Sequence, residues 1–320
     1  MKRDPQSRHS SVRAPREVRA EAARRHAASD SNAGATAAGS AEGREFQFSH
    51  RDFQRIRQLI YERAGISLSE AKQDMVYSRL SRRLRARGIQ RFSDYLELLA
   101  AGDSAEWEAF TNALTTNLTS FFREEHHFPI LAEHALRRGR NQSYTVWCNA
   151  CSTGEEPYSI AMALAEAFAT LTPPVTILAS DVDTHVLRKA EEGVYPLDRV
   201  ERLGAVRARR FFLRGTGQQA GFVRVRPEIR SLITFRRVNL LESNWGVRPH
   251  FDALFCRNVM IYFDKTTQAS MLRRFAPLLK PDGLLFVGHS ESLFHVVDTF
   301  RLRGKTVYEL ARKHDAQGSA

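Results

Sequence analysis

The chain has 320 residues, of which 42% are hydrophobic and 26% are charged, so it is long enough for two folded domains. The formal net charge of +12 predicts an acidic partner, which nucleic acid, a membrane surface and an acidic protein all satisfy. A transmembrane helix is not expected, because no run of about 18 uncharged apolar residues occurs. The N-terminus also lacks the hydrophobic segment of a secreted protein, so we expect a cytoplasmic protein.

The first 44 residues are rich in Arg, Ala, Ser and Gly and contain almost no large apolar side chain. Such a segment cannot bury enough surface to offset the entropy lost on ordering. We therefore expect residues 1–44 to be a disordered basic tail and residues 315–320 to be a disordered C-terminus. Part of the net positive charge then lies outside the folded domains.

Residues 45–125 are predicted to form a small all-helical domain, because their apolar residues recur at helical spacing. The segments with this spacing are Phe46 to Ala64, Ser69 to Ala86, Phe92 to Leu99, and Trp107 to Thr115. Gly65 and Gly88 follow the first two segments and are typical helix ends. In the second segment, the basic side chains of Arg79, Arg82 and Arg83 lie beside the apolar stripe.

After a basic linker at residues 126–143, strand-like and helix-like segments alternate from residue 144 to residue 314. The predicted strands are at 145–148, 175–179, 253–256 and 283–288, with a closing antiparallel hairpin at 300–308. This alternation predicts an α/β fold with a mostly parallel sheet covered on both faces. A glycine-rich stretch interrupts it, and we interpret about 211–236 as a small antiparallel β-subdomain.

Ligands of open α/β sheets bind at the carboxyl ends of the strands, and the loop from Asn149 to Pro157 follows the first predicted strand. Its small residues allow close approach of a ligand, but only Gly154 is a glycine, so the dinucleotide fingerprint is absent. Glu155 and Glu156 at the start of the next helix are a poor environment for a pyrophosphate. They suit the helix N-terminus and a cationic ligand.

Two further segments end at the same edge of the predicted sheet. Asp181 follows the second strand, where folds of this class bind ribose hydroxyls, and Asp183 is a candidate cap for the following helix. Arg257 and Asn258 leave the third strand, and Tyr262 lies about one helical turn further on. A phenol at that position can point towards a substrate.

The cysteines and histidines do not predict a metal site. Cys148 and Cys151 form a C-x-x-C pair at a strand end, but a zinc site needs about four ligands and the sequence has no second pair. We interpret this pair as structural cysteines of a reducing compartment. His126, His127 and His289 are expected to be structural and to lack a metal-binding grouping.

Several long motifs carry a family resemblance. They are the segments 116–124 (TNLTSFFRE), 152–159 (STGEEPYS), 255–263 (FCRNVMIYF), 278–283 (LLKPDG) and 288–292 (GHSES). Together they resemble the CheR family of chemotaxis receptor methyltransferases, and the similarity extends from Glu45 to Arg312. Motifs of this length do not agree in this order by chance.

The resemblance implies a helical N-terminal domain followed by a Rossmann-like S-adenosylmethionine-dependent methyltransferase domain with a small β-subdomain. Cofactor contacts would fall on Asn117, Thr119, Arg123, Glu155 or Glu156, Asp181, Asn239, Leu240, Arg257 and Asn258. Tyr262 matches the tyrosine at the family's reaction centre, where Arg257 would help to orient the reactants. Arg79, Arg82 and Arg83 match a receptor-facing helix. Gly215 and Gly217 resemble a loop that docks a receptor C-terminal peptide.

The predicted activity is methyl transfer from S-adenosylmethionine to glutamate carboxylates of methyl-accepting chemotaxis receptors, by a monomer recruited to receptor arrays at the inner membrane. A glutamate has a pKa of about 4.3, so it is already ionised and needs no general base. A nucleic-acid or amine methyltransferase remains an alternative because of the basic charge, although Asn258 lacks the prolines of an Asn-Pro-Pro-Tyr pocket. A non-catalytic binding module is a second alternative. A dehydrogenase is disfavoured by the missing glycines.

Overall fold

The structure, a computed structural model, describes residues 44–248, 250–293 and 298–311, which belong to one compact unit. The predicted basic tail, except for Arg44, and the predicted disordered C-terminus lie outside these residues. No helix in the described ranges is long and apolar enough to span a lipid bilayer.

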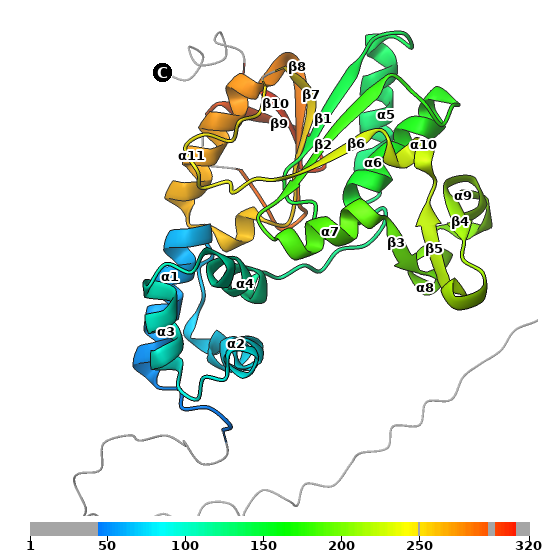
Figure 1. The fold of residues 1–320 in the computed structure, drawn as a ribbon. Coiled ribbons are helices and arrows are strands. Elements are labelled where there is room, and N and C mark those ends of the chain that lie inside the picture. Colours follow the sequence, from blue (N-terminus) through cyan, green and yellow to red (C-terminus); the bar gives the residue numbers. More distant parts are fainter. Residues whose placement is uncertain (1–43, 249, 294–297, 312–320) are drawn as a thin grey trace, which may run out of the picture. The chain divides into compact units, whose positions relative to one another are not determined.

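The N-terminal part is all-helical (Figure 1). It contains α1 (His50–Ala64), η1 (Glu70–Lys72), α2 (Gln73–Arg87), α3 (Phe92–Ala100) and α4 (Ser104–Leu114). The first helix begins at His50 rather than near Phe46, because Ser49 and Asp52 form a reciprocal capping box at 3.1 Å and 2.8 Å. Phe46 is nevertheless buried in the helical core. The predicted second helix begins as η1 and becomes α-helical at Gln73.

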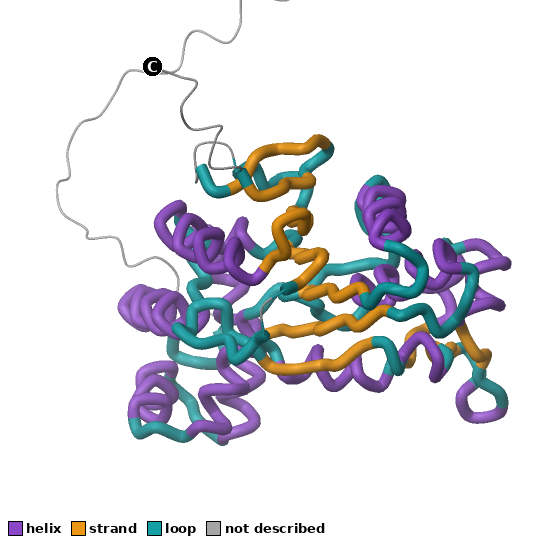
Figure 2. The backbone as a smooth tube through the Cα atoms, turned by 90° about the horizontal axis from the view of Figure 1, so that it is seen from above, coloured by secondary structure: helices purple, strands orange, loops and turns teal. Residues whose placement is uncertain are grey.

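A seven-stranded sheet, whose strands are orange in Figure 2, forms the C-terminal part. Its strand order is β6-β2-β1-β7-β8-β10-β9. Its strands are β1 (Tyr144–Cys148), β2 (Val175–Asp181), β6 (Ile233–Arg237), β7 (Phe251–Cys256), β8 (Leu279–Val287), β9 (Phe300–Gly304) and β10 (Val307–Leu310). The first five in spatial order are parallel, and β10 and β9 are antiparallel. The predicted α/β fold is confirmed.

Two apolar cores lie on opposite faces of this sheet. One is shared by the sheet, α5 (His127–Arg138), α6 (Glu155–Phe168) and α7 (Thr184–Glu192). The other is shared by the sheet and α11 (Lys265–Phe275), which η4 (Ala276–Leu278) connects to β8. Helix α5 lies inside the predicted linker at 126–143. The segment was interpreted as a linker because of its basic residues, although its buried Phe128, Leu131 and Ala135 are three and four residues apart, which is helical spacing.

The small antiparallel sheet has the order β3-β5-β4 and comprises β3 (Val194–Pro196), β4 (Phe212–Arg214) and β5 (Phe222–Val225). Helices α8 (Leu197–Glu201), α9 (Gly204–Phe211) and α10 (Pro227–Arg230) and the turn η2 (Gly217–Gln219) accompany it. The predicted boundaries of 211–236 therefore need correction at both ends. The subdomain begins earlier, at β3, and β6 pairs in parallel with β2 of the main sheet, because a short strand gives no sign of its partner in sequence.

Candidate functional site

A cavity of about 400 Å³ opens at the carboxyl ends of β1, β2, β6 and β7. The segment from Ala64 to Met75 of the helical part and the connection at 114–119 complete its wall. Every residue predicted to contact the cofactor or the reaction centre lines the cavity except Glu155. These residues are Asn117, Thr119, Arg123, Glu156, Asp181, Asn239, Leu240, Arg257, Asn258 and Tyr262.

The loop after β1 shows which of the two candidate glutamates, Glu155 or Glu156, lines the cavity. Gly154 has a φ of +98°, and a Cβ there would lie 2.8 Å from both Ala190 Cβ and the Tyr195 hydroxyl, so the tight turn requires glycine. The Glu155 carboxylate turns away and accepts a hydrogen bond from Thr153 Oγ1 at 2.6 Å. Glu156 faces the cavity instead.

Arg257 lies at the centre of a buried charge cluster. Its guanidinium is 2.7 Å from Glu156 Oε2 and 3.3 Å from Glu124 Oε2. Burial raises the pKa of Glu156 against the opposing effect of Arg257, and the charges of Glu124 and Glu291 raise it further. Two carboxylates thus contact one arginine, and the charge of Glu291 acts on Glu156 as well, so the excess of negative charge favours binding of a positively charged group.

Asp181 ends β2, and its two oxygens accept hydrogen bonds from the backbone N–H groups of Ser152 at 2.8 Å and Asp183 at 3.0 Å. Burial raises the pKa of Asp181 to about 6. Asp183 has the predicted role of a helix cap, because its Oδ1 accepts from His185 N and Val186 N at the start of α7.

The connection between the helical part and the sheet passes over the cavity. Asn117 Nδ2 donates to Asp183 Oδ2 at 2.8 Å, and the Asn117 carbonyl accepts from Ser152 Oγ at 3.1 Å. Phe122 and Glu124 have φ values of +52° and +55°, which non-glycine residues rarely adopt. These two left-handed residues direct the chain around Arg123, and no sequence signal predicted them.

Tyr262 lies in the short helix η3 (Met260–Tyr262) that follows β7. Its side chain is half-buried, and its hydroxyl forms no hydrogen bond within the described ranges. Its carbonyl accepts from Ser67 N at 3.0 Å, so the helical part helps to fix its position. The phenol is therefore available at the cavity wall.

Glu291 is a residue of the site that the sequence analysis did not single out. Its carboxylate accepts backbone hydrogen bonds from Asn258 and Gly288 on one oxygen, and from Met260 and Ile261 on the other, at 2.6–3.4 Å. One buried side chain thereby fixes the loop between Arg257 and Tyr262. The only sequence signal was the motif GHSES, in which Glu291 stands.

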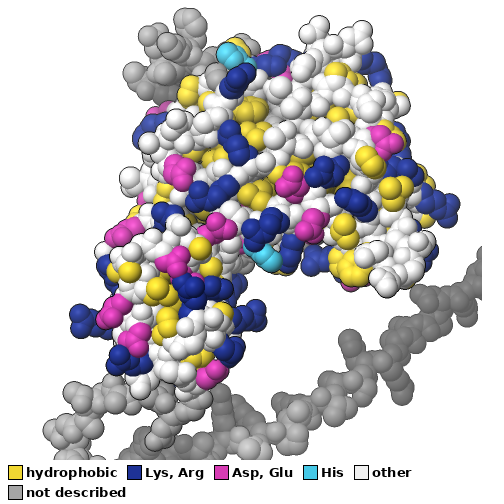
Figure 3. All heavy atoms as spheres, in the orientation of Figure 1, with side chains coloured by type: hydrophobic (Ala, Val, Ile, Leu, Met, Phe, Trp, Pro, Cys, Tyr) yellow, Lys and Arg dark blue, Asp and Glu magenta, His cyan; other side chains and the backbone are white. Residues whose placement is uncertain are grey.

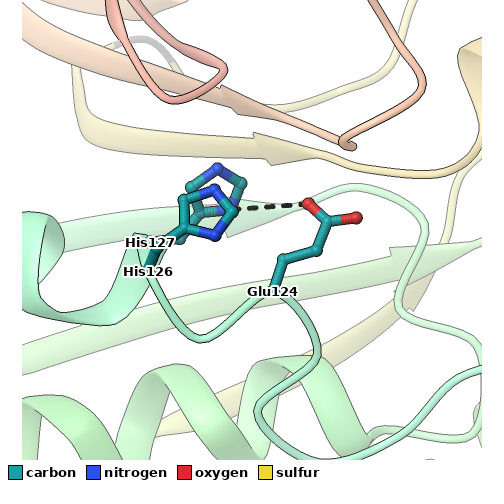
Figure 4. A group of neighbouring side chains, drawn as sticks. All are labelled: Glu124, His126 and His127. Atoms are coloured by element: carbon teal, nitrogen blue, oxygen red, sulfur yellow. Dashed lines mark ion pairs between the residues drawn. The ribbon is translucent and has the colours of Figure 1, made fainter. Parts of the chain in front are cut away.

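The histidines correct one expectation. His126, His127 and Glu124 lie together, with potential ligand atoms within 4.8 Å of one another, although the sequence analysis expected no such grouping (Figure 4). Residues 124, 126 and 127 come together because a left-handed residue precedes α5. His127 Nδ1 is 3.9 Å from Glu124 Oε2, and both imidazole Nε2 atoms contact the Lys305 carbonyl at 3.1–3.2 Å. Burial and the nearby Arg257 charge lower the pKa of His127 to about 3, so it is neutral.

Cys148, Cys151 and Cys256 are buried free thiols, as expected for structural cysteines. Burial raises the pKa of each thiol well above its usual value, so none is a reactive thiolate. Cys148 Sγ donates to Glu156 Oε1 at 3.2 Å and thereby helps to orient that carboxylate.

The predicted receptor-facing arginines occupy three different environments on α2. Arg79 donates to the carbonyls of Leu114 and Thr115 at the end of α4, at 3.1 Å and 2.6 Å. Arg83 forms a bidentate pair with the buried Glu106 at 2.8 Å and 2.9 Å. Arg82 is exposed and has no hydrogen bond or ion pair within the described part of the chain.

Gly215 and Gly217 lie in the loop between β4 and β5. A Cβ at Gly215 would come within 2.1 Å of the Gln219 carbonyl oxygen, and Gly217 has a φ of +57°, so the loop conformation requires both glycines. Leu213 and Phe222 of the flanking strands are exposed beside this loop.

Comparison with known proteins agrees with this geometry. The model of the CheR methyltransferase all-alpha domain matches residues 51–115, and the model of the CheR methyltransferase SAM binding domain matches residues 117–309. The chain is 59% identical to the chemotaxis protein methyltransferase of Salmonella typhimurium, covering 81% of this chain and 90% of that protein. It is 56% identical to the chemotaxis protein methyltransferase of Escherichia coli, covering 81% and 91% of the two chains. This chain therefore belongs to the CheR family and is a methyltransferase that uses S-adenosylmethionine.

Proposed function

We propose that this enzyme methylates glutamate side chains of methyl-accepting chemotaxis receptors, giving glutamyl methyl esters and S-adenosylhomocysteine. The observation that carries the proposal is the cavity itself. It combines an excess of buried carboxylates with an available phenol on Tyr262, and the imidazole buried nearest to Arg257 is neutral. An enzyme that alkylates a carboxylate needs no stronger base, because its acceptor is already an anion.

We assign the cofactor to the cavity residues by their chemistry. Glu156 would bind its ammonium group, Asp181 its ribose hydroxyls, and Asn117, Thr119, Arg123, Asn239, Leu240, Arg257 and Asn258 would complete the wall. When bound, the cofactor supplies a sulfonium whose methyl carbon bonds to the glutamate oxygen while the sulfur keeps the electron pair of the broken bond. The protein's contribution is to orient the carboxylate and to exclude water from it.

The cavity mouth suggests how a receptor helix approaches. Leu118 is 80% exposed and Ile261 is 53% exposed, although both line the cavity in which Tyr262 lies. We infer that the apolar side of a receptor methylation helix contacts them while its glutamate reaches Tyr262. On α2, Arg82 is the arginine whose charge is available to attract acidic residues of the receptor, since Arg79 and Arg83 have internal partners.

The remaining partner assignments follow from the resemblance and from the surface. We propose that the loop with Gly215 and Gly217 docks a receptor C-terminal peptide, with Leu213 and Phe222 supplying apolar contacts. On the face shown in Figure 3, basic side chains are interspersed with acidic and apolar ones, which suits a mixed protein surface better than a phosphate backbone. We place the enzyme, as a monomer, at receptor arrays in the cytoplasm.

Incubation with labelled cofactor and receptor-containing membranes tests the function. We expect labelled receptor that releases methanol in mild alkali, because a carboxyl ester hydrolyses and a methylamine does not. The substitution Tyr262→Phe should lower kcat by about tenfold and leave cofactor affinity nearly unchanged, because one hydrogen bond in the transition state contributes about 1.4 kcal/mol. Label in RNA or DNA, or alkali-stable label on the receptor, would exclude the proposed reaction. Equal turnover with and without the hydroxyl would remove Tyr262 from it.

The pH dependence of cofactor binding tests Asp181. An ionised carboxylate accepts two ribose hydroxyls, and a protonated one does not. Because the pKa of Asp181 is raised to about 6, affinity for S-adenosylhomocysteine should weaken by roughly tenfold from pH 7 to pH 5. The free energy of unfolding of the ligand-free enzyme should change in the opposite direction, so Asp181 should contribute more stability at pH 5 than at pH 7. A carboxyl whose pKa is raised by folding favours the folded state at low pH, and this contribution is lost as the pH rises from about 4 to 6.

Calorimetric titrations of the wild-type enzyme and of Asp181→Asn separate this group from the other buried carboxylates. The variant should bind more weakly at pH 7 and lose most of the change in affinity between pH 7 and pH 5. An unchanged pH profile in the variant would exclude Asp181 as the group responsible.

A further inference from the structure

The small antiparallel sheet packs one of its faces against the core of the methyltransferase part. In its strand β3, Tyr195 is 4% exposed, whereas Val194 and Pro196 on either side of it are exposed. Successive side chains of a strand point to opposite faces, so Tyr195 belongs to the inner face of the small sheet. Its ring lies in the same apolar core as Tyr158 of α6, with 6.1 Å between the ring centroids. Tyr195 thereby connects the small sheet with the start of α6.

The loop after β1 contains a carbonyl group whose usual donor is missing. At the start of an α-helix, the Thr153 carbonyl would accept from the N–H group four residues later, but Pro157 has none. The Tyr195 hydroxyl donates to this carbonyl instead, at 2.7 Å. Burial raises the pKa of Tyr195 well above its usual value, so the hydroxyl keeps its proton and remains a donor. A residue of the small sheet therefore completes the hydrogen bonding of this loop.

The same loop forms a wall of the cavity. Ser152 and Glu156, on either side of Thr153 in the sequence, line the cavity, whereas the side chain of Tyr195 lies behind the loop. Ser152 N donates to Asp181 Oδ2 at 2.8 Å, and Glu156 is the residue that we assign to the ammonium group of the cofactor. A shift of the Thr153 carbonyl would be transmitted along the backbone to both lining residues. Tyr195 therefore acts on the cavity through the loop and not by direct contact.

The ring of Tyr195 supports a second segment of the cavity wall. Phe121 lies between Thr119 and Arg123, which both line the cavity. Its ring meets the Tyr195 ring edge to face, with 4.9 Å between centroids and 74° between the ring planes. Phe212 of β4 makes a similar contact with Phe121 at 5.5 Å. One tyrosine thus contacts two wall segments that are far apart in the sequence, one through its hydroxyl and the other through its ring.

We propose that Tyr195 is a positioning residue for the cofactor. It holds the loop after β1 through its hydroxyl and the connection at Phe121 through its ring. The small sheet, whose loop we propose as a peptide dock, is then also part of the structure that shapes the cofactor cavity. The inference rests on the assignment of the cofactor to this cavity and not on the acceptor. Its test uses S-adenosylhomocysteine without a receptor, so a failure to methylate glutamate would leave it standing.

The substitution Tyr195→Phe tests the hydroxyl, because it keeps the ring. The Thr153 carbonyl loses its donor, so the loop is less well ordered before the ligand binds. The dissociation constant for S-adenosylhomocysteine, measured by calorimetry, should rise by about tenfold, and the KM for S-adenosylmethionine should rise with it. At saturating cofactor, kcat should stay within about twofold of wild type, because the bound ligand restores the loop in the ground state and the transition state alike.

Tyr158→Phe is the matched control. The Tyr158 hydroxyl is buried and also donates to a backbone carbonyl at 2.7 Å, but its acceptor is Ala190 in α7 and not the loop after β1. Both variants lose one hydrogen bond of the same kind, so their melting temperatures should fall by similar amounts. Only Tyr195→Phe should lose affinity for the ligand. Unchanged affinity in Tyr195→Phe, or an equal loss of affinity in the two variants, would overturn the proposal.

The ring contact is tested by Phe121→Leu, alone and combined with Tyr195→Leu. The single substitution at Phe121 should raise the dissociation constant for S-adenosylhomocysteine by about threefold, because the segment with Thr119 and Arg123 loses an aromatic contact. In the Tyr195→Leu background, the same substitution should have a smaller effect, because the contact is already lost. Fully additive effects, or unchanged affinity in Phe121→Leu, would show that the ring does not position this segment.

Discussion

Replacing Arg257 with glutamine should destabilise the enzyme by about 3–5 kcal/mol and abolish measurable cofactor binding, because it removes the one cation from a buried carboxylate cluster. The guanidinium lies 2.7 Å from Glu156 and 3.3 Å from Glu124, and its side chain is fully buried. Without it, both carboxylates lose a buried partner and Glu156 protonates more readily. Urea unfolding measures the stability, and calorimetry with S-adenosylhomocysteine measures the binding.

The pH dependence of the loss of stability in Arg257→Gln identifies the cause of that loss. Removal of Arg257 raises the pKa of Glu156 further, and a carboxyl with a raised pKa loses folded-state stability as the pH rises. The difference between wild type and variant should therefore be small near pH 5 and largest near pH 8. Arg207→Gln is the matched control, because its pair with Glu166 is only partly buried and should contribute about 1 kcal/mol or less. Equal losses in the two variants would contradict the central role of Arg257.

Replacing Glu291 with glutamine should lower turnover by about a hundredfold, because the loop that carries Tyr262 would lose its anchor. The carboxylate accepts four backbone N–H groups, two on each oxygen. The glutamine amide keeps one oxygen that can accept two of these N–H groups, but its NH₂ group is a donor and faces the other two N–H donors without forming a hydrogen bond. We therefore also expect a stability loss of about 3 kcal/mol. Steady-state kinetics with saturating cofactor gives the turnover, and chemical denaturation gives the stability.

The kinetic pattern of Glu291→Gln distinguishes a positioning residue from a merely structural one. A misplaced Tyr262 lowers kcat more than it raises the KM for the cofactor, whereas general loosening of the fold affects both. Glu291→Asp keeps the charge and should recover part of the turnover. Glu133→Gln, in an exposed ion pair with Arg137, should behave like wild type. A Glu291→Gln enzyme with wild-type kcat would show that the loop holds its shape without this anchor.

The sequence predicted the parts of the site that follow from position along a strand. Asp181 was predicted at the ligand edge and Asp183 as a candidate helix cap, because the end of a parallel strand lies at that edge. The structure places Asp181 in the cavity wall and Asp183 at the start of α7, and the contact of Asp181 with a ligand stays a prediction. Position along a strand does not show which of two adjacent residues at the start of the next helix contacts the ligand. Only the three-dimensional turn at Gly154 shows that Glu156 lines the cavity and that Glu155 does not.

Residues that act across long sequence separations were beyond prediction. Glu291 contacts backbone groups 33 residues earlier, and such contacts leave no periodic pattern in a single sequence. The same reason explains why the start of the small sheet was missed, because β3 pairs with β5 across an intervening segment. The cluster of His126 and His127 with Glu124 is local and depends instead on the positive φ of Glu124, which a non-glycine residue rarely adopts. Local periodicity identifies elements, whereas pairing and long-range hydrogen bonds require the folded chain.

The attachment of the helical part to the catalytic loop has a consequence for how such an enzyme can be divided. Ser67 bonds the carbonyl of Tyr262, Asn239 bonds the carbonyl of Arg63, and Gly65 leaves no room for even a methyl group beside the Phe263 ring. The part of the chain that we expect to meet the receptor is thus also structural support for the chemistry. If the helical part were exchanged between two relatives to change their targets, the surface around residues 239–263 that it contacts would have to be exchanged with it. Receptor recognition and the geometry of the catalytic loop therefore cannot be altered independently.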